Sequence, residues 1–495
     1  MDATLSIAGS LLAEAASQPA AEAARGTAAT LLINLAYLVA AACFIFGLKW
    51  LSSPRTARRG NLLSSVGMLI AVVVTLLDRQ IVGYTTIIAG LIVGSVVGAT
   101  LALRVQMTAM PQMVGMLNGF GGLASGSVAL AEFLRVYYDA SHDPRLDTLV
   151  AIALSALIGM LTFTGSVTAF GKLQGWKIGG KPLSNPLLLP GHHAINILML
   201  LIAVLLGVLI TANYQNALWA VILLSALALV LGVMVVTPIG GADMPVVISL
   251  MNSYSGLAAM TTGFALDNYC LIITGALVGA SGIILTKIMC NAMNRSLLNV
   301  VAGGFGQEIT AAGDTSAEGK TVRQMDAEEA AMVLEASQKV FVIPGYGMAV
   351  AQAQHAVAEM ASLLAAKGVE VRFGVHPVAG RMPGHMNVLL AEANVPYEQL
   401  ADLELNGEME QCDVALVIGA NDVVNPDARR PGSQIAGMPI FDVDKARTVM
   451  VCKRSLNPGF AGIENPLFFN DNTVMLFGDA KKMITGIVAE LKASK

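Results

Sequence analysis

Long apolar runs fill the first part of the chain, and shorter apolar runs alternate with polar stretches in the last part. Nine runs are about as long as a bilayer-spanning helix, which takes roughly 17 to 25 residues. They lie at 29–51, 62–77, 84–103, 113–134, 149–171, 194–211, 217–236, 246–266 and 269–289. Because these runs lack the charged face of a soluble helix, we expect a polytopic α-helical membrane domain.

After about Asp326 short Val- and Ile-rich strands alternate with helical patterns, which is typical of a parallel α/β sheet. Strands are expected at 340–343, 370–375, 414–418, 439–441, 448–452 and 474–477. The pattern therefore divides the chain into an N-terminal extension (1–28), a transmembrane domain (29–289), a linker (290–325) and a soluble Rossmann-like domain (326–495).

Composition supports a membrane protein. The 495 residues are 55% hydrophobic and only 13% charged, with a mean hydropathy of +0.66, which is far more apolar than a soluble chain. A net charge of −4 gives no reason to expect a nucleic-acid partner. Five scattered cysteines lack CxxC or zinc spacing, so we interpret them as packing residues and expect no metal site.

Lys and Arg gather at alternate ends of the expected spans, which sets an orientation. They are Arg55, Arg58, Arg59, Arg104, Lys172, Lys177, Lys181, Lys287 and Arg295. Since cytoplasmic loops collect cations, we expect the N-terminus outside and the C-terminal domain in the cytoplasm. The first residues are Ala-rich and lack a basic start, so we expect an extension there rather than a cleaved targeting peptide.

A few polar residues fall inside the expected spans, where they are costly. Asn118 lies in the fourth run and Asn252 in the eighth, Glu132 lies near the outer end of the fourth, and Asp243 lies in the loop before the eighth. Two interpretations stay open for Asn118 and Asn252. They either form hydrogen bonds between helices or hold water along a proton path.

The segment 339–354, KVFVIPGYGMAVAQAQ, reads as a strand, a tight turn and an alanine-rich helix. This is the order in which a Rossmann unit presents a dinucleotide pyrophosphate to a helix N-terminus. Gly345 would make the turn, Gly347 would let the backbone approach the phosphates, and Val350 stands at the third position of the fingerprint. By itself a Gly-X-Gly after a strand is often only a sharp turn.

The expected second strand lacks the acid that binds the ribose 2′-OH of NAD at its carboxyl end, because its one acid, Glu370, is at the other end. The strand at 448–452 runs into Lys453, Arg454 and Ser455, which suit a phosphate dianion. Together these features favour NADP over NAD. A solvated strand end is the plainer interpretation of the two cations.

Several longer motifs carry a family resemblance. They are IGGADMP from Ile239, LMNSYSG from Leu250, ITGALVGASG from Ile273, MNRS from Met293, PGYGMAVAQAQ from Pro344, HPVAGRMPGHMNVLLAEA from His376, IGANDVVNP from Ile418, and KRS followed by NPGFAG. With these motifs the chain resembles the β subunit of the proton-translocating NAD(P) transhydrogenase, over nearly everything after residue 30.

The resemblance implies a subunit of a Re/Si-specific enzyme in the bacterial inner membrane. NADP(H) would bind this chain, and an α subunit would bind NAD(H) and add membrane helices, in a dimer of α–β units. Hydride transfer from NADH to NADP⁺ would be coupled to inward proton movement. The sequence agrees in one respect, since only one dinucleotide fingerprint is found. The alternative is a transporter or channel regulated by NADP(H).

The resemblance also implies roles for particular residues. Gly345, Tyr346 and Gly347, with Met348, Ala349 and Val350, would meet the pyrophosphate, and Val378, Ala379, Gly380, Arg381, Met382 and Pro383 would hold the other side of the cofactor. Gly419, Ala420, Asn421, Asp422 and Val423 would lie near the nicotinamide ribose. Lys453, Arg454 and Ser455 would take the 2′-phosphate, and Leu456, Asn457, Pro458, Gly459 and Phe460 would form a lid. Gly437, Met438, Asp479 and Ala480 would complete the pocket. No side chain is needed as a nucleophile, because the cofactor carries the chemistry.

Two positions depart from the family pattern. Many members have a histidine in the fourth span as a proposed proton carrier, where this chain has Asn118, which cannot titrate. We therefore expect Asn118 and Asn252 to hold a water file opening toward Asp243, with the titrating group on the partner's helices. Phe460 stands where relatives can have Tyr, so a hydroxyl contact to the cofactor is lost.

Overall fold

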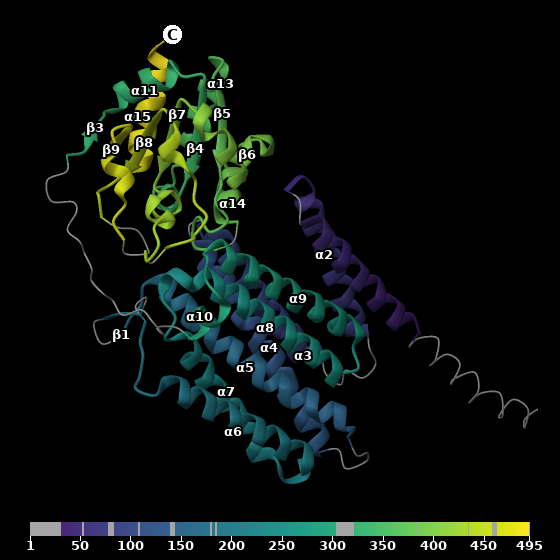
Figure 1. The fold of residues 1–495 in the computed structure, drawn as a ribbon. Coiled ribbons are helices and arrows are strands. Elements are labelled where there is room, and N and C mark those ends of the chain that lie inside the picture. Colours follow the sequence, from purple (N-terminus) through teal and green to yellow (C-terminus); the bar gives the residue numbers. More distant parts are fainter. Residues whose placement is uncertain are drawn as a thin grey trace, which may run out of the picture.

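A computed structural model describes residues 31–51, 54–77, 84–106, 109–138, 144–178, 181–183, 186–302, 321–382, 384–433, 435–457 and 463–494. The chain folds into a bundle of long helices and an α/β domain built on a parallel sheet (Figure 1). The fold class expected from the apolar pattern is confirmed.

All nine expected spans are helical. They are a helix at Leu31–Leu51, α2 (Pro54–Leu77), α3 (Tyr84–Arg104), α4 (Met110–Tyr138), α5 (Leu146–Gln174), α6 (His192–Ala212), α7 (Leu218–Val236), α8 (Met244–Ala265) and α9 (Tyr269–Ala292). Among the described helices, eight are long and apolar enough to cross a membrane, and α8 is the more polar ninth. It can be more polar because it packs between α4, α5 and α9, so that most of its surface contacts protein rather than lipid.

Glycines set how closely these helices approach. A Cβ added to Gly256 of α8 would lie 2.9 Å from the carbonyl oxygen of Gly275 and even closer to the nitrogen of Gly279, so α8 and α9 approach closely at these small residues. Two glycines of α3, Gly90 and Gly94, have no such close neighbour. A Cβ at Gly90 or Gly94 would meet nothing within 4 Å, and α3 has no buried residue. Among the described residues, Gly90 and Gly94 therefore do not bring α3 into close contact with another helix.

Some cations counted as loop residues belong to helices. Arg55, Arg58 and Arg59 lie in the first turns of α2. Lys172 lies in the last turn of α5, where its Nζ donates to the carbonyl oxygens of Thr237 (2.7 Å) and Ile239 (2.6 Å). Lys172 is therefore a buried cap on the end of α7 rather than a solvated loop charge.

The α/β domain has one seven-stranded sheet, in which every pair of neighbouring strands is parallel. Its strands are β3 (Arg323–Gln324), β4 (Lys339–Pro344), β5 (Glu370–Gly374), β6 (Leu400–Ala401), β7 (Val414–Ile418), β8 (Thr448–Lys453) and β9 (Thr473–Phe477), in the order β3-β9-β8-β7-β4-β5-β6. Sequence patterning missed only the two-residue edge strands β3 and β6. The small hairpin of β1 (Lys177–Ile178) and β2 (Lys181–Pro182) follows α5.

One expected strand, Pro439–Phe441, is wrong. This segment has no strand pairing and crosses the loops at the carboxyl edge of the sheet. The backbone N–H of Phe441 donates to the carbonyl of Val423, and the carbonyl of Pro439 pairs with a histidine ring. Its apolar residues are buried beneath the sheet without forming a strand, since Pro439 has no N–H to donate to a ladder.

The two faces of the sheet are covered differently. Val340 and Val342 of β4 face a layer of helices, and Phe341 and Ile343 face the opposite side. The helices are α11 (Ala327–Glu335), α13 (Gln354–Ala366), α14 (His385–Glu392) and α15 (Ala480–Ala493), and the other face is covered by short 3₁₀ segments, chiefly at Leu403–Gln411 and Pro466–Phe469. Because both faces are buried, the strands read as continuous apolar runs.

Candidate functional site

The loops after β4 and β7 meet at the point where the strand order reverses direction, which is where open α/β sheets bind ligands. The N–H of Gly345 donates to the carbonyl of Ile418, and the N–H of Gly347 donates to that of Gly419 at 2.8 Å. A Cβ on Gly347 would lie 2.6 Å from the Cα of Gly419. The two glycines of the fingerprint therefore allow direct backbone contact and hydrogen bonds between these two loops.

The helix after this turn is shorter than the sequence suggests. The helix α12 covers only Tyr346–Val350, and Gln352, with a φ of 51°, separates it from α13. Met348 and Ala349 are fully buried in the core, whereas Val350 is 45% exposed. Val350 therefore does not make the close helix–strand contact that the third fingerprint position usually makes.

Tyr346 contacts the loop that follows β5. The guanidinium carbon of Arg381 lies 4.4 Å from the centre of the Tyr346 ring. The N–H of Arg381 donates to Nδ1 of His385 at 3.1 Å. Burial, with the charge of Arg381, lowers the pKa of His385 to about 4, so the ring is neutral and carries its proton on Nε2. This Nε2 is buried without a partner in the described part of the chain.

A second neutral histidine ties the same loop to the segment at 437–439. The N–H of Val378 donates to Nδ1 of His376 at 3.2 Å, so Nε2 carries the proton and donates to the carbonyl of Pro439 at 2.8 Å. Burial lowers the pKa of His376 to about 4. Sequence reasoning missed both histidines, although they flank the motif HPVAGRMPGH.

Lys453, at the carboxyl end of β8, is half-buried and already engaged. Its Nζ donates to Oδ1 of Asn421 (2.8 Å) and to the carbonyl of Asn457 (2.5 Å), and it lies 4.8 Å from the Phe468 ring centre. Burial lowers its pKa, and the charge of Asp422 opposes that shift. Lys453 thus joins the loop after β7 to the segment after β8.

Arg454, the next residue, is exposed to solvent, and Ser455 beside it is partly exposed. Of these two adjacent cations, Arg454 is therefore the one that faces the surface. Four expected cofactor residues, Pro383, Pro458, Gly459 and Phe460, lie outside the described residues.

The remaining expected pocket residues have structural roles. Asp479 caps α15, because its carboxylate accepts the N–H of Lys482 at 3.2 Å, and Ala480 is buried. Gly437, with a φ of 78°, lies against Asn294 from the end of α9, so that a Cβ there would overlap Asn294 Nδ2. Gly437 and its neighbour Met438 therefore lie where the α/β domain meets the helical bundle.

Two hydrogen bonds join the α/β domain to the nearby ends of helices in the bundle. Arg381 Nη1 donates to the carbonyl of Leu173 in α5 at 2.8 Å, and Asn294 Nδ2 donates to the carbonyl of Ala436 at 2.7 Å. Val378 packs on the apolar cluster formed by α5, α7, α8 and α9. The loop expected to hold the cofactor is thus also in contact with the membrane part.

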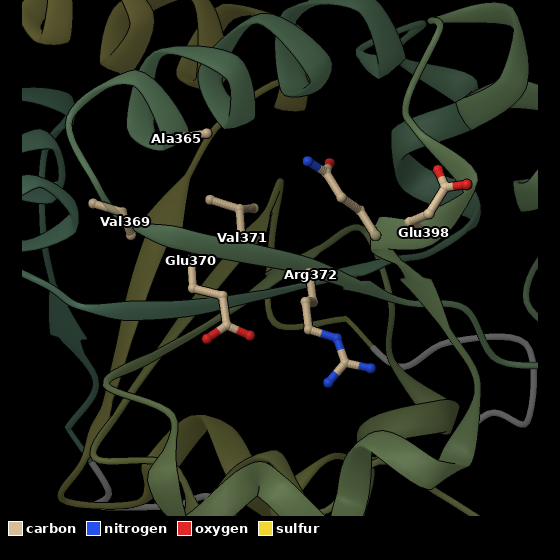
Figure 2. A pocket seen from close by; sticks show the side chains of 7 residues that line it. Ala365, Val369, Glu370, Val371, Arg372 and Glu398 are labelled. Carbon is tan, nitrogen blue, oxygen red and sulfur yellow. The ribbon is translucent and has the colours of Figure 1, made fainter.

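A cavity of about 460 Å³ lies elsewhere, beside β5 and the start of β6 (Figure 2). In Figure 2 Glu370 and Arg372 point to one side of β5 and Val371 to the other. Arg372 pairs with Glu408 at 2.6 Å. Glu370 is the first residue of β5, so it stands at the amino edge of the sheet, away from the β4 and β7 loops.

The polar residues expected in the spans are brought together in part. Asn118 Nδ2 donates to Oγ of Ser166 in α5 (3.1 Å), and its Oδ1 accepts from Oγ of Ser255 in α8 (2.6 Å). We call these three residues the Asn118 cluster. Asn252 lies one turn before Ser255. Its backbone carbonyl, rather than its side chain, accepts the hydrogen bond from the Ser255 hydroxyl. Asp243 is buried and receives two hydrogen bonds from Arg295 Nη1, at 2.8 and 2.6 Å.

The fold and the site define a polytopic membrane protein that carries a Rossmann-like α/β domain. Residues 33–490 match the model of the family described as NAD(P) transhydrogenase beta subunit, and the chain belongs to that family. Two sequences from Rhodospirillum rubrum named NAD(P) transhydrogenase subunit beta, one from a designated strain, are each 50% identical to it over 464 residues, which cover 92% of this chain and 98% of the relative. The resemblance carried by the motifs is thereby confirmed.

Proposed function

We propose that this transhydrogenase subunit binds NADP(H) at the carboxyl edge of its sheet. The observation that carries this proposal is the position of Arg454, exposed beside Lys453 at the end of β8. No acid stands at the carboxyl end of β5, since Glu370 begins that strand. A 2′-phosphate fits the cations, whereas a ribose 2′-OH would lack its usual acceptor.

The residues on this edge fit a bound dinucleotide. Arg381, Lys453 and Arg454 supply positive charge from the loops after β5 and β8, and Tyr346 supplies a ring surface between them. The buried Nε2–H of His385 is a donor without a partner among the described residues. When bound, NADP(H) supplies the hydride chemistry, and the chain's own residues bind and orient it.

The second nucleotide belongs to a partner. The described part of the chain contains one Rossmann-like sheet, and hydride transfer between nicotinamides needs two dinucleotide sites. An α subunit with the NAD(H) domain and further membrane helices completes the Re/Si-specific enzyme, as a dimer of α–β units. NADH reduces NADP⁺ on this chain as protons move inward across the bacterial inner membrane, with the N-terminus outside and the sheet domain in the cytoplasm.

Coupling is supported by the contacts between the two parts. The guanidinium of Arg381 lies over the Tyr346 ring and also donates a hydrogen bond to the carbonyl of Leu173 in α5. A change at the nucleotide edge therefore reaches the end of a helix whose Ser166 belongs to the Asn118 cluster. Along α8, the proton path leads from that cluster past Asn252 to Asp243, and the titrating group comes from the partner's helices.

The test replaces Asn118 or Asn252 with Leu in membranes that hold both subunits. Proton pumping is measured beside a cyclic reaction that uses bound NADP(H) without net proton uptake. We expect pumping to fall at least tenfold in Asn118→Leu while NADP binding and the cyclic reaction survive, because the bridge between α4, α5 and α8 is lost. Normal pumping in both variants would leave the two residues as packing groups. Absence of any transhydrogenation in an assembled complex would favour a transporter or channel regulated by NADP(H).

A further inference from the structure

The last turn of α5 lies where the α/β domain sits over one end of the helical bundle (Figure 1). Two adjacent residues of this turn contact different parts of the protein. The carbonyl of Leu173 accepts a hydrogen bond from Arg381 Nη1 of the α/β domain at 2.8 Å. Lys172, the residue before it, is 3% exposed and donates to the carbonyls of Thr237 (2.7 Å) and Ile239 (2.6 Å). The turn therefore holds the α/β domain with one residue and the chain after α7 with the next.

The carbonyls that Lys172 holds belong to the segment that leads to Asp243. Ile239 lies beyond the end of α7, and a one-turn 3₁₀ helix, Gly241–Asp243, follows it. The N–H of Asp243 donates to the carbonyl of Gly240 at 3.1 Å. The ammonium of Lys172 thus fixes the peptide that joins Ile239 to Gly240, on which the turn of Asp243 is built.

A second pair of adjacent residues, after α9, repeats this arrangement. Asn294 Nδ2 donates to the carbonyl of Ala436 in the α/β domain at 2.7 Å. Arg295, the next residue, donates to both carboxylate oxygens of Asp243, at 2.8 and 2.6 Å. Asp243 is therefore held directly by Arg295 and, through its own loop, by Lys172.

The two contact points on the α/β domain are also joined to each other. His376 Nε2 donates to the carbonyl of Pro439, and its Nδ1 accepts the N–H of Val378. His376 thus ties the loop that carries Arg381 to the segment that begins at Ala436. The contacts therefore form a closed ring around the junction, in which each link is a hydrogen bond or a short stretch of continuous chain.

Apolar side chains pack inside this ring. Leu173, Ile239 and Met244 are each at most 5% exposed and belong to one cluster, against which Val378 of the α/β domain packs. Because protein interiors are close-packed, a movement of the α/β domain against this cluster presses on the loop that carries Asp243.

The position of Lys172 goes beyond what capping a helix requires. A cap needs only the last carbonyls of the helix, whereas Ile239 lies past the end of α7. Lys172 forms no ion pair among the described residues, so its charge depends on the two carbonyls. Hydrogen bonds from an ammonium are roughly twice as strong as neutral ones, and the link between α5 and the Asp243 loop is therefore stiff.

We propose that Lys172 is a positioning residue for the Asp243–Arg295 pair. The inference deepens the proposed function and rests on it. A movement of Arg381 at the nucleotide edge shifts the end of α5, and Lys172 carries this shift to the loop of Asp243. Asp243 then changes its place relative to Arg295, at the end of the proposed proton path.

The experiment uses the assembled complex in inverted membrane vesicles, with proton uptake and the cyclic NADP(H) reaction measured on the same preparation. Lys172→Met removes both hydrogen bonds and keeps the length of the side chain, and Lys172→Arg is the conservative variant that keeps charged donors. His192→Leu is the matched control. His192 is 2% exposed and also donates to a carbonyl of α7, but to that of Met234, which lies before the loop.

We expect Lys172→Met to lower proton uptake about tenfold or more, the usual effect of losing a hydrogen bond from a charged group. The cyclic reaction should change less than about twofold. Lys172→Arg should restore uptake to within about threefold of the unmodified complex, and His192→Leu should stay within about twofold. If Lys172→Met does not assemble, Lys172→Gln takes its place, and a loss of about threefold or more is expected because the amide keeps a donor without the charge.

A double variant separates positioning from a general loss of packing. Arg295→Lys weakens the pair with Asp243 without removing the charge, and it is combined with Lys172→Met. If Lys172 acts through this pair, the double variant falls no further than Lys172→Met alone, because substitutions within one network are not additive. Independent damage to the fold would multiply the two losses.

Undiminished proton uptake in Lys172→Met would overturn the positioning role alone. An equal loss in His192→Leu, a parallel fall of the cyclic reaction in Lys172→Met, or multiplied losses in the double variant would do the same. An unmodified complex that transfers hydride without any proton uptake would instead overturn the proposed coupling, and the positioning role with it.

Discussion

At the scale of single residues, two adjacent cations have different tasks. Lys453 is half-buried and holds Asn421 and the carbonyl of Asn457, so it stabilises the loops after β7 and β8 whatever nucleotide is present. Arg454 is exposed and can turn to an incoming phosphate. The sequence alone treats both as equivalent ligands of the 2′-phosphate.

We therefore predict that Arg454→Ala weakens NADP⁺ binding about tenfold or more and leaves NAD⁺ binding unchanged, because hydrogen bonds to charged groups contribute roughly 1.5–3 kcal/mol. Lys453→Met should weaken both nucleotides, since it loosens two loops. Affinities for NADP⁺ and NAD⁺ are measured on this chain in membranes without the α subunit, because the NAD(H) site of the partner would mask NAD⁺ binding here. Equal losses for both nucleotides in Arg454→Ala would show that this cation does not read the 2′-phosphate.

At the scale of elements, the turn after β4 is fixed by its contact with the turn after β7. Gly347 is needed because the backbone of Gly419 occupies the space of a side chain. Backbone atoms cannot move aside as a flexible side chain would, so the two turns tolerate no added volume. Tyr346, between these two glycines, lies 4.4 Å from the guanidinium carbon of Arg381, measured from its ring centre.

We predict that Gly347→Ala destabilises the α/β domain by about 1–3 kcal/mol, the usual cost of overpacking, and lowers NADP(H) affinity. The matched control is Gly407→Ala, where a Cβ would meet nothing within 4 Å. Pulse proteolysis in urea reports the stability of the domain within the whole chain. A Gly347→Ala protein as stable as the control would mean that the two turns can separate at little cost.

At the scale of the whole molecule, two side-chain hydrogen bonds, beside the packing of Val378, join the carboxyl edge of the sheet to the helical bundle in the described part of the chain. Asn294 is suited to its place because it adopts a φ of 49°, which asparagine tolerates, and donates to the carbonyl of Ala436. Arg381 makes the other contact on Leu173. Both contacts involve backbone carbonyls, so they depend on the placement of the domain rather than on a particular partner side chain.

We predict that Asn294→Asp, which keeps the shape but replaces the donor with an acceptor, lowers proton-coupled turnover about fivefold, corresponding to a hydrogen bond of about 1 kcal/mol. The cyclic reaction, which needs no proton movement through the helices, should be little affected. The two rates are compared in vesicles containing both subunits. A parallel fall of both would place the effect on nucleotide binding rather than on coupling.

The pattern of the sequence predicts nine long helices, of which eight are apolar enough to cross a membrane, together with the five long strands and the cations after β8. Each of these follows from local chemistry. The length of an apolar run decides whether it can cross a bilayer, and a strand buried on both faces must be apolar throughout. The segment 339–354 likewise identifies the strand–turn–helix order.

The places of the remaining residues follow from packing between distant parts of the chain. The loss of the expected strand at Pro439–Phe441 and the contact of Gly437 with Asn294 depend on neighbours far away in the chain. The two-residue strands β3 and β6 carry too little pattern to be predicted. The Asn118 cluster also needed the fold, because polar groups in three separate runs meet only when helix packing brings their faces together.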